Sequence, residues 1–541
     1  MPQNHTGKTL AVLVFVFLGF LNQPSHAGDY PIRFRDVTKE AGLFQPLVGI
    51  MGHGGAWGDV DNDGLPDLFV GGFCDRPDKA YAPAKGPVSA KLFRNLGNGK
   101  FATVTPTQAQ FFARTSGAVF ADLNNDGTLE LYVANNAKPK TRHKQEPQKS
   151  AQVAHSRLFR NEAGKLIDVT KSSRACPDDL FTARNIGVFD YDNDGLLDLF
   201  IVEDTFTKSP RSVLLRNKGK LQFEDVTEKV GLPGDIFGLG LAVADLNNDG
   251  RPDFFVPHSN RMFLSKGRKA QYYEPESLKS VLAWKAINRE DWPCGAAFGD
   301  LNRDGLLDLV VTIHGIPARN KIYLNTGLKN GVPGFRDVTE QAGLGTQVPI
   351  RVPHVELQDF DNDGFLDIYT TAAWMDDKQN VTPLIYRCVG LKGNVPRFEP
   401  PQPIKEPMVY YPAGPSADYN KDGRIDLFLI NWFEGNYCRL LENQCDKRRW
   451  LNVRVVGKTM NRMGIGAQVK VYKAGQLGKA QGLLGFQEVT TGYGYASGQP
   501  AVCHFGLDKA DRVDVLIQLP NGKRIEQPNV KSDQTLTITE K

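Results

Sequence analysis

One nine-residue motif, repeated seven times, constrains the fold of this chain more than any other feature. The first copy is Asp59–Asp67, and the others begin at Asp122, Asp190, Asp245, Asp300, Asp359 and Asp418. Each copy places oxygen-bearing side chains at positions 1, 3, 5 and 9 and a glycine at position 6. Calcium requires several oxygen ligands at about 2.3–2.6 Å, and glycine permits the sharp bend between them. The motif therefore predicts calcium sites, about one ion for each copy.

We expect the ligands to come from positions 1, 3, 5, 7 and 9 of each loop. Position 7 varies in residue type, as expected where only its backbone carbonyl is used. The predicted metal-binding residues are Asp59, Asp61, Asp63, Leu65, Asp67, Asp122, Asn124, Asp126, Thr128, Glu130, Asp190, Asp192, Asp194, Leu196, Asp198, Asp245, Asn247, Asp249, Arg251, Asp253, Asp300, Asn302, Asp304, Leu306, Asp308, Asp359, Asp361, Asp363, Phe365, Asp367, Asp418, Asn420, Asp422, Arg424 and Asp426.

Two other interpretations of the motif fail. An EF-hand needs a glutamate at position 12 followed by a helix, but position 12 here is apolar or threonine, as in Val70 and Thr370, within a short β-rich run. A simple hairpin turn explains one Asp-Asn-Asp-Gly sequence, but not seven copies that all carry an acid at position 9. The motifs are therefore predicted to be calcium loops between strands.

The motif recurs at intervals of 63, 68, 55, 55, 59 and 59 residues. A period of about 60 residues with several short strands is typical of propellers and solenoids. Each unit has an apolar run before the loop, a second run after it and further runs downstream, as in residues 117–120, 131–133, 158–161 and 166–170. The sequence therefore predicts four strands in each unit.

The two ends of the repeat complete one another. Residues 34–38 match the fourth run of a unit but precede the first loop, whereas the seventh unit lacks a fourth run. An N-terminal strand that completes the last blade would close the ring and protect a sheet edge. The predicted fold class is all-β, with a seven-bladed β-propeller closed by an N-terminal strand and followed by a small β-sandwich-like C-terminal domain.

Three segments are predicted along the chain. Residues 1–27 resemble a secretory signal peptide, with a charge at Lys8, an apolar run over residues 9–21 and a small-x-small cleavage site. This run of 13 residues is shorter than the about 20 that a membrane span needs, so we expect a secreted, periplasmic or cell-surface protein without a transmembrane segment. Residues 28–447 form the predicted propeller, and residues 448–541 form the C-terminal domain, where apolar and polar residues alternate.

Charge and cysteine content restrict the partners and the cross-links. The net charge is +4, but the loops hold 24 of the 61 acidic residues, so calcium would leave a basic surface. Because Lys and Arg are scattered, no nucleic-acid partner is expected. Seven cysteines cannot all pair internally, and Cys438 and Cys445 are either a disulfide or buried thiols. His504, inside an apolar strand, is predicted to be a satisfied core histidine.

Polar side chains gather where the chain enters the first strand or leaves the second strand of several units. These positions meet at the end of the propeller opposite the calcium loops, near the central channel, where propellers usually bind ligands. Such groups suit an additional transition metal or acid–base chemistry, or they are polar loop ends that face water. The candidate residues are His53, Arg184, Glu203, Asp204, His258, His314, His354 and Glu356.

Residues 30–445, with their acidic loops and Asp-Val-Thr strands, resemble the FG-GAP/VCBS repeats of the integrin α-subunit propeller. Residues 461–467, 492–495, 504–507 and 520–522 look like the ASPIC/UnbV module. The combination resembles the cartilage acidic protein family and its bacterial UnbV-like homologues. This chain differs from the animal members because it is not acidic and carries no cysteine-rich EGF-like tail after the module.

Two functions are compatible with these observations. The resemblance to integrins implies a calcium-binding adhesion or binding module for an extracellular protein or carbohydrate. The alternative is an enzyme of the lyase, dehydratase or cyclase type that uses the His/Glu/Arg residues. The chain contains no P-loop, Rossmann fingerprint, nucleophile elbow or zinc-protease helix. A convergent histidine cluster would favour the enzyme, and dispersed histidines beside exposed aromatic residues would favour binding.

Overall fold

The computed structural model describes residues 30–80, 87–136, 155–177, 182–204, 210–267 and 270–541. The predicted signal peptide, residues 1–27, lies outside these residues. The described chain is nearly all β, and its helices are short. They are α1 (Phe44–Leu47), α2 (Thr170–Ser173), α3 (Glu276–Val281), α4 (Thr339–Ala342) and the 3-10 turn η1 (Ala480–Gly482). No helix in the described ranges has the length and hydrophobicity needed to cross a membrane.

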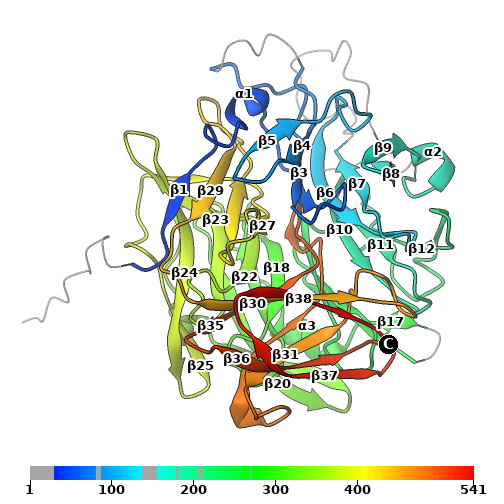
Figure 1. Ribbon diagram of the computed structural model, residues 1–541, viewed down its shortest axis with the longest axis vertical. Coiled ribbons are helices and arrows are strands. Elements are labelled where there is room, and N and C mark those ends of the chain that lie inside the picture. The colour runs from blue at the N-terminus through cyan, green and yellow to red at the C-terminus, as the bar shows by residue number, and fades with distance from the viewer. Residues whose placement is uncertain (1–29, 81–86, 137–154, 178–181, 205–209, 268–269) are drawn as a thin grey trace, which may run out of the picture.

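Strand pairing within the described residues gives seven sheets built on four antiparallel strands each, followed by a C-terminal domain (Figure 1). The strands of the first four sheets are β2 (Gly55–Gly58), β3 (Asp67–Val70), β4 (Lys91–Asn95), β5 (Phe101–Thr103); β6 (Thr115–Ala121), β7 (Glu130–Asn135), β8 (Arg157–Glu162), β9 (Lys165–Asp168); β10 (Ala183–Phe189), β11 (Asp198–Glu203), β12 (Val213–Asn217), β13 (Phe223–Asp225); and β14 (Gly240–Ala244), β15 (Asp253–Val256), β16 (Arg261–Lys266), β17 (Gln271–Tyr273).

The other three sheets follow the same order, with one extra strand, β26, paired to β23. Their strands are β18 (Pro293–Gly299), β19 (Asp308–Ile313), β20 (Lys321–Lys329), β21 (Val332–Asp337); β22 (Val355–Gln358), β23 (Asp367–Met375), β24 (Val381–Lys392), β25 (Val395–Glu399), β26 (Met408–Tyr410); and β27 (Ser416–Ala417), β28 (Asp426–Leu429), β29 (Arg439–Asn443), β1 (Phe34–Asp36).

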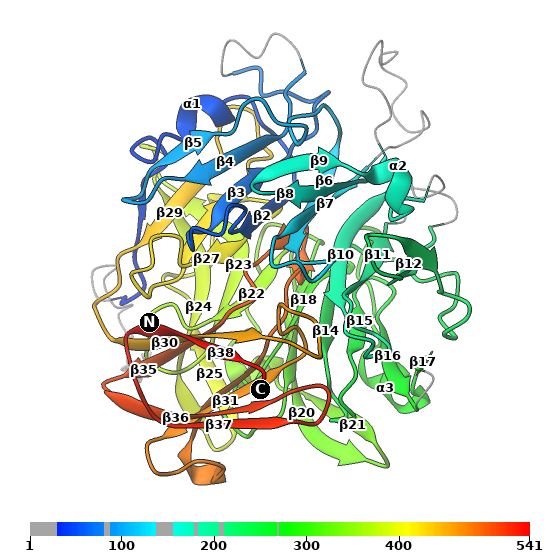
Figure 2. The same ribbon diagram turned by 45° about the vertical axis from the view of Figure 1, so that its right-hand side comes forward.

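The first strand of each sheet lies beside the first strand of the next. β2, β6, β10, β14, β18 and β22 contact one another in that order. β27 completes the circle: Gln358 of β22 donates to the Ser416 hydroxyl at 3.3 Å, and the Trp57 indole of β2 donates to the carbonyl of Pro415 at 3.0 Å. The sheets therefore surround a central axis as the blades of a β-propeller, as predicted (Figures 1 and 2).

The N-terminal strand closes the ring, as predicted. β1 pairs antiparallel with β29, with Phe34 opposite Asn443 and Asp36 opposite Leu441. The Val37 N–H continues the ladder to the carbonyl of Leu440 at 2.9 Å. The last blade therefore combines strands from both ends of the repeat, and the edge of β29 is paired.

The repeated Asp-x-Thr sequence fastens the outermost strand of a blade to its neighbour. In the third sheet, Asp225 accepts hydrogen bonds from the Thr227 N–H at 3.0 Å and the Thr227 hydroxyl at 2.7 Å. The Thr227 hydroxyl oxygen in turn accepts the N–H of Leu214 at 2.9 Å. The bond from the threonine N–H to the aspartate recurs at Asp36, Asp168 and Asp337, so each of these sequences locks the end of the fourth strand.

An asparagine at the end of the third strand ties neighbouring blades together. The buried Asn217 amide donates to the carbonyl of Leu197 in its own blade at 2.9 Å and to that of Leu123 in the preceding blade at 2.6 Å. Asn161 and Asn443 make equivalent bonds to the preceding blade, to Val60 and Phe360. These asparagines satisfy buried backbone carbonyls that no strand partner reaches.

The C-terminal domain is a two-sheet sandwich. One sheet has the order β35-β30-β38 and the other β32-β31-β36-β37. Alternate residues of β30, including Val453 and Val455, pack into a core with Val471 and Val515 of the facing sheet. The strands are β30 (Arg449–Val456), β31 (Gln468–Lys473), β32 (Leu483–Glu488), β33 (Gly494–Tyr495), β34 (Ser497–Gly498), β35 (Cys503–Asp508), β36 (Arg512–Gln518), β37 (Arg524–Lys531) and β38 (Gln534–Thr539).

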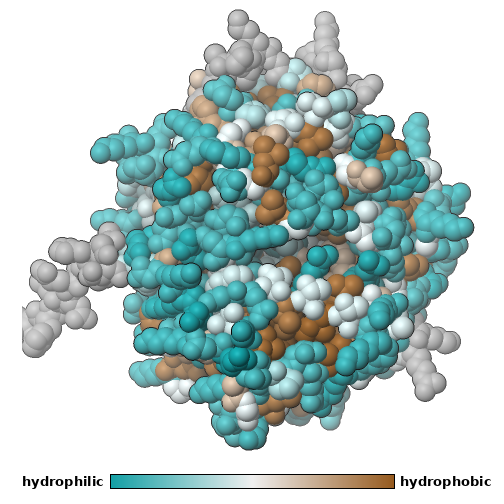
Figure 3. Space-filling view, viewed as in Figure 1, coloured by the Kyte–Doolittle hydropathy of each residue, from teal (hydrophilic) through white to brown (hydrophobic). Residues whose placement is uncertain are grey.

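Figure 3, in the view of Figure 1, shows a largely hydrophilic surface with an apolar area over the C-terminal strands in its lower half. All seven cysteines are free thiols, so Cys438 and Cys445 do not form a disulfide. Cys438 is buried, and its sulfur accepts the N–H of Asn431 at 3.4 Å. The buried-thiol alternative therefore holds for this pair.

Candidate functional site

Each acidic loop is closed by its own carboxylates. The position-1 carboxylate accepts the N–H of the position-6 glycine in all seven loops, at 2.6–3.1 Å. The position-5 carboxylate accepts the N–H of position 7 in all seven, at 2.8–3.0 Å. Every position-6 glycine has a φ between +79° and +92°, which disfavours other residues. The repeated spacing thus produces the same backbone loop in each blade.

The position-9 carboxylates are buried where the loop joins the second strand. The Asp198 side chain accepts the N–H of Tyr191 at 3.0 Å and that of Asn217 at 2.7 Å. Burial raises the pKa of Asp198 well above its ordinary value and raises the pKa of Asp67 to about 7 and of Glu130 to about 8. Neighbouring loop carboxylates raise these pKa values further. The ionised loops are therefore costly without a cation.

The loop carboxylate oxygens that accept no hydrogen bond are suitable ligands for a hard cation. Asp59 Oδ1, Asp192 Oδ1, Asp361 Oδ1, Asp418 Oδ1 and Asp426 Oδ2 are buried without a hydrogen-bond partner. Buried polar atoms normally have a partner, so these point to a ligand. Three loops bring three carboxylates within 4.8 Å of one another, namely Asp59, Asp61 and Asp67; Asp190, Asp192 and Asp194; and Asp359, Asp361 and Asp367.

The loops with aspartate at position 3 also carry an arginine on their third strand. Arg94 pairs with Asp61 at 2.9 Å, and Arg216 pairs with Asp192 at 2.9 Å. Arg387 pairs with both Asp361 and Asp363, at 2.7 and 2.6 Å. These arginines offset part of the negative charge of the most acidic loops.

The raised carboxyl pKa values give the cation-free protein a distinctive pH dependence. Burial raises the pKa of Asp190 and of Asp300 to about 7 and of Asp122 to about 6. A carboxyl with a raised folded-state pKa stabilises the fold below its ordinary pKa of about 4, and this contribution is lost as the pH rises through the folded-state value. We therefore expect the difference in Tm between calcium-loaded and calcium-depleted protein to widen between about pH 5 and pH 8. Thermal melts at four pH values test this, and a constant difference contradicts it. Titratable groups outside the loops affect the Tm of both forms equally, so their contributions cancel in the difference.

The position-4 side chain of five of the seven loops contacts the next loop around the ring, a link that was not predicted from the sequence. Asn62 donates to the carbonyl of Gly127 in the next loop at 3.0 Å, Asn125 to Gly195 at 2.8 Å, and Asn193 to Gly250 at 2.9 Å. Arg303 and Asn362 make the same contact to Gly364 and Gly423. All seven position-4 residues carry a donor side chain (Asn, Arg or Lys), and this was the available sequence signal.

The C-terminal domain covers the face that carries the acidic loops. The Arg462 N–H donates to the Asn125 side chain at 2.9 Å, and His504 bonds Asn362 at 2.7 Å. Arg448 pairs with Asp361 at 3.0 Å, and Asn452 donates to Asp418 at 3.3 Å. The other imidazole nitrogen of His504 lies 2.7 Å from the side-chain oxygen of Asn452, so this histidine is buried between two asparagines, as predicted for a core residue.

A segment of the C-terminal domain, residues 489–500, runs into the central channel. We refer to it as the channel segment. Its β33 pairs with β14, and its β34 pairs with β2 on another blade. Gly492 lies against the carbonyl of Ile186, and Gly498 against that of Ala118, so further inner strands surround it. The axis of the propeller is therefore filled by the C-terminal domain.

The channel segment buries two of the predicted site residues. His354 and Glu356 bond each other at 3.0 Å, as expected for residues that share one face of a strand, and both are fully buried. His354 Nδ1 accepts the N–H of Tyr495 at 2.9 Å, and Glu356 accepts the amide of Gln499 at 2.9 Å. This pair therefore anchors the channel segment and does not line an open face.

The charged residues of the third blade are also committed to structural contacts. Asp204 pairs with Arg184, and both side chains are buried. Glu203 accepts the N–H of Thr182 at 2.8 Å and that of Arg211 at 3.0 Å. None of these groups is placed as a solvent-facing acid or base.

The other three predicted histidines lie at the end of the channel opposite the loops. His53 bonds the Tyr495 hydroxyl at 2.6 Å, stacks on Phe73 with ring centroids 5.1 Å apart and packs edge-on against Trp432 at 4.4 Å. Trp292 stacks on His258 at 5.2 Å and on His314 at 4.9 Å. We call His53, His258, Trp292, His314 and Trp432 the histidine–tryptophan cluster; all five are partly exposed.

Several polar atoms of this cluster lack partners. His53 Nε2, His258 Nδ1, His314 Nδ1 and Trp292 Nε1 have no hydrogen-bond partner among the described residues. Burial lowers the pKa of His258 to about 4 and, with nearby Arg351 and Arg184, lowers that of His314 to about 3. The imidazoles are therefore neutral at pH 7 and can donate or accept.

The histidines do not converge as a metal centre would require. Within the described chain, the groups of three or more residues able to hold a metal ion contain only loop aspartates and no histidine. His258 and His314 instead both stack on Trp292. This arrangement, with neutral imidazoles beside indole rings, suits recognition of a ligand surface.

Comparison with known proteins shows what both parts of the chain are similar to. The FG-GAP-like repeat matches residues 59–133, 190–256 and 300–370, and the ASPIC and UnbV family matches residues 457–541. Cartilage acidic protein 1 of Xenopus tropicalis is 26% identical over 508 residues, covering 87% of this chain and 71% of that protein. The protein of the same name from Homo sapiens is 24% identical over 518 residues, covering 91% and 72%.

Two solved structures resemble this chain more weakly than the sequence relatives do. The V. cholerae biofilm matrix protein Bap1 is 11% identical over 91% of this chain and 69% of that chain, with a TM-score of 0.30. The rhamnogalacturonan lyase YesW is 13% identical over 76% and 75%, with a TM-score of 0.36. These scores are too low to bear on fold or function. The sequence matches show that the chain joins FG-GAP-like repeats to an ASPIC and UnbV domain and is similar to cartilage acidic protein 1 over most of its length.

Proposed function

We propose that this protein is an exported, calcium-binding propeller that binds an extracellular protein or carbohydrate through the histidine–tryptophan cluster. The proposal rests mainly on four polar atoms that are buried without a hydrogen-bond partner, one each on His53, His258, His314 and Trp292. Buried donors and acceptors without partners are costly, and small side-chain movements around a bound partner would satisfy them.

The surroundings of the cluster support a binding surface. Arg76 lies over the Trp432 ring at 4.9 Å, and the neighbouring Phe433 is 37% exposed. Exposed aromatic rings beside arginine are the residues that most often dominate binding energies at interfaces. His258 also has a φ of +77°, a conformation that non-glycine residues adopt mainly where function or packing requires it.

Calcium is proposed for the acidic loops because their donors are all oxygens. The carboxylate-rich loops and their leftover buried oxygens support a hard cation. Calcium would offset two of the three or four negative charges of each loop and fix the face on which the C-terminal domain rests. The role proposed for the metal is structural, because the partner-binding cluster lies at the other end of the channel.

The enzyme hypothesis is less well supported. Its acid–base candidates are engaged elsewhere: Asp204 with Arg184, Glu203 with backbone N–H groups, and Glu356 with His354 and Gln499. The remaining histidines lie beside aromatic rings, as expected for binding, but His53, His258 and His314 gather at one end of the channel and are not dispersed.

Substitution of the two tryptophans tests the proposed surface. We expect the wild-type protein to bind some members of an array of extracellular glycans and matrix proteins. A Trp292→Ala/Trp432→Ala double variant should bind the same ligands at least tenfold more weakly, because indole truncation at an interface typically costs about 2 kcal/mol or more. Leu328→Ala is the control, since Leu328 is 45% exposed on the outer β20–β21 hairpin. Equal binding by the double variant and the control would reject the surface. Whether the wild-type protein binds a glycan or a protein of the array shows which class of partner it recognises.

A further inference from the structure

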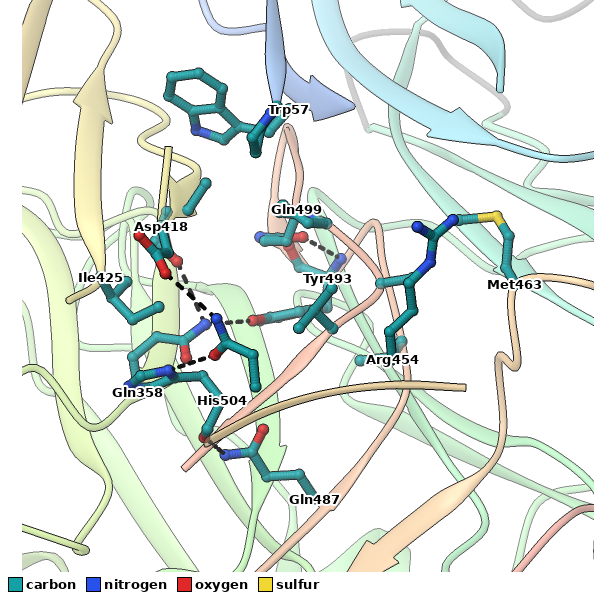
Figure 4. A pocket seen from close by; sticks show the side chains of 18 of the residues that line it. Trp57, Gln358, Asp418, Ile425, Arg454, Met463, Gln487, Tyr493, Gln499 and His504 are labelled. Atoms are coloured by element: carbon teal, nitrogen blue, oxygen red, sulfur yellow. Dashed lines mark hydrogen bonds between the residues drawn. The ribbon is translucent and has the colours of Figure 1, made fainter. Parts of the chain in front are cut away.

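A cavity of about 540 Å³ lies between the propeller and the C-terminal domain (Figure 4). The propeller contributes inner-strand and loop residues such as Gln358 and Asp418, and the C-terminal domain contributes β30 and β38. Tyr493 and Gln499 of the channel segment also line it. Cavities of about 300–1,000 Å³ at domain interfaces are common ligand sites. The histidine–tryptophan cluster lies at the other end of the channel, so this is a separate site.

The strand register places four polar side chains on the C-terminal wall. β30 and β38 run parallel, with Asn452 opposite Thr535 and Arg454 opposite Thr537. Alternate residues of a strand point to opposite faces, so these four residues share the face away from the sandwich core. All four line the cavity, whereas their neighbours Leu451, Val453 and Val455 are buried in that core.

Arg454 is the distinctive group on this wall. It is exposed, and the structure gives it no ion pair or hydrogen bond within the described residues. Arg448, which also lies between the domains, instead pairs with Asp361. A guanidinium without a partner in a cavity is suited to a carboxylate, because its planar N–H groups match the two oxygens.

The opposite wall determines what else the ligand carries. Figure 4 shows Asp418 and Gln358 on the side of the cavity facing Arg454. Asp59 and Asp418 also line the cavity, but both are position-1 residues of acidic loops, and their free oxygens are assigned to the loop cations. Arg454 is the one guanidinium among the described residues that line the cavity, so it provides for one carboxylate on the ligand. Threonine hydroxyls and the amides of Gln358 and Gln487 instead offer hydrogen bonds to neutral hydroxyl groups.

We propose that this cavity binds a polyhydroxylated monocarboxylate, the chemistry of a sugar acid. Its carboxylate lies on Arg454, and its hydroxyl groups bond Thr535, Thr537 and the glutamine amides. Because the ligand touches both domains, it also strengthens their contact.

Isothermal titration of the full-length protein in calcium buffer tests the site with three probes. D-Glucuronate carries both parts of the proposed chemistry, whereas D-glucose has only the hydroxyl groups and propionate only the carboxylate. We expect D-glucuronate to bind at least tenfold more tightly than either. Arg454→Gln is expected to weaken its binding at least tenfold, because a charge-assisted bond is lost.

Two further variants make the outcome decisive. Arg512→Gln is the matched control, since Arg512 is an exposed arginine on β36 in the other sheet of the sandwich, and it should bind D-glucuronate as the wild type does. Thr537→Val removes one hydroxyl group at constant shape and should weaken binding several-fold even if Arg454→Gln fails to fold. Absence of D-glucuronate binding, equal affinity for all three probes, or wild-type affinity in both cavity variants would overturn the proposal. None of these results affects the histidine–tryptophan cluster, which is tested with other variants.

Discussion

Removal of calcium is expected to lower the Tm of this protein by more than about 10 °C. Extracellular calcium modules often bind with a Kd of about 10⁻³ M, so each site contributes about 1.4 kcal/mol at about 10 mM calcium. The seven loops together then contribute about 10 kcal/mol, comparable with the total stability of a domain. The physical reason is that every loop buries carboxylates whose charges otherwise face one another.

Elemental analysis and thermal melts check this expectation together. The protein dialysed against calcium should hold about one calcium ion per loop, and EGTA should remove the ions and lower the Tm. Asp190→Ala should lose about one ion, because it removes the position-1 ligand of a loop. Asp235→Ala removes an acid outside the loops and should lose none. An unchanged Tm in EGTA, or equal calcium contents in the two variants, would contradict calcium binding by the loops.

The substitution Gly494→Ala is expected to displace the channel segment and to destabilise the protein by about 3 kcal/mol or more. Gly494 has a φ of +78°, and a methyl group on it would lie 2.6 Å from the His354 ring and 2.7 Å from the carbonyl of Val355. Both neighbours are buried in β22 and its approach, so neither can move aside at low cost.

Gly475→Ala separates the steric effect from backbone strain. Gly475, in the same domain, has a φ of +74° but no atom within 4 Å of the added methyl group. It should therefore cost only about 1 kcal/mol, the usual penalty for alanine in this conformation. Denaturant unfolding gives both values, and limited proteolysis shows whether residues 489–500 become accessible. Equal effects of the two substitutions would show that the channel segment does not depend on close packing at Gly494.

The propeller was predictable because its determinants are local. Loop closure by Asp190 and Gly195, and strand locking by Asp225 and Thr227, each involve residues at most five apart, so the repeat makes them visible. Ring closure was also predictable, since β1 and the seventh unit have complementary strand content. The position-4 donors were overlooked because their partners lie in the next blade, as Asn62 and Gly127 show.

The channel segment was not predictable from the same evidence. Its residues Gly492–Gly498 are rich in glycine and suggest a turn, and their partners β14 and β2 lie more than 200 residues away. This is also why His354 and Glu356 were correctly paired with each other but placed on an open face. The C-terminal domain determines which groups of the candidate site stay accessible, and the sequence pattern does not reveal where that domain lies.

The closure of the ring by β1 has a consequence for the order of folding. The first strand to be synthesised has its partner some 400 residues later, since Thr38 accepts the N–H of Leu440. Joining segments that far apart costs about 5 kcal/mol of chain entropy, and it becomes possible only when the seventh blade has emerged. Until then, a partly synthesised chain holds an unpaired N-terminal strand and an open edge on its newest blade, both able to pair with another chain. The strand β1, whose pairing removes both exposed edges, is therefore the part of the propeller that is synthesised earliest.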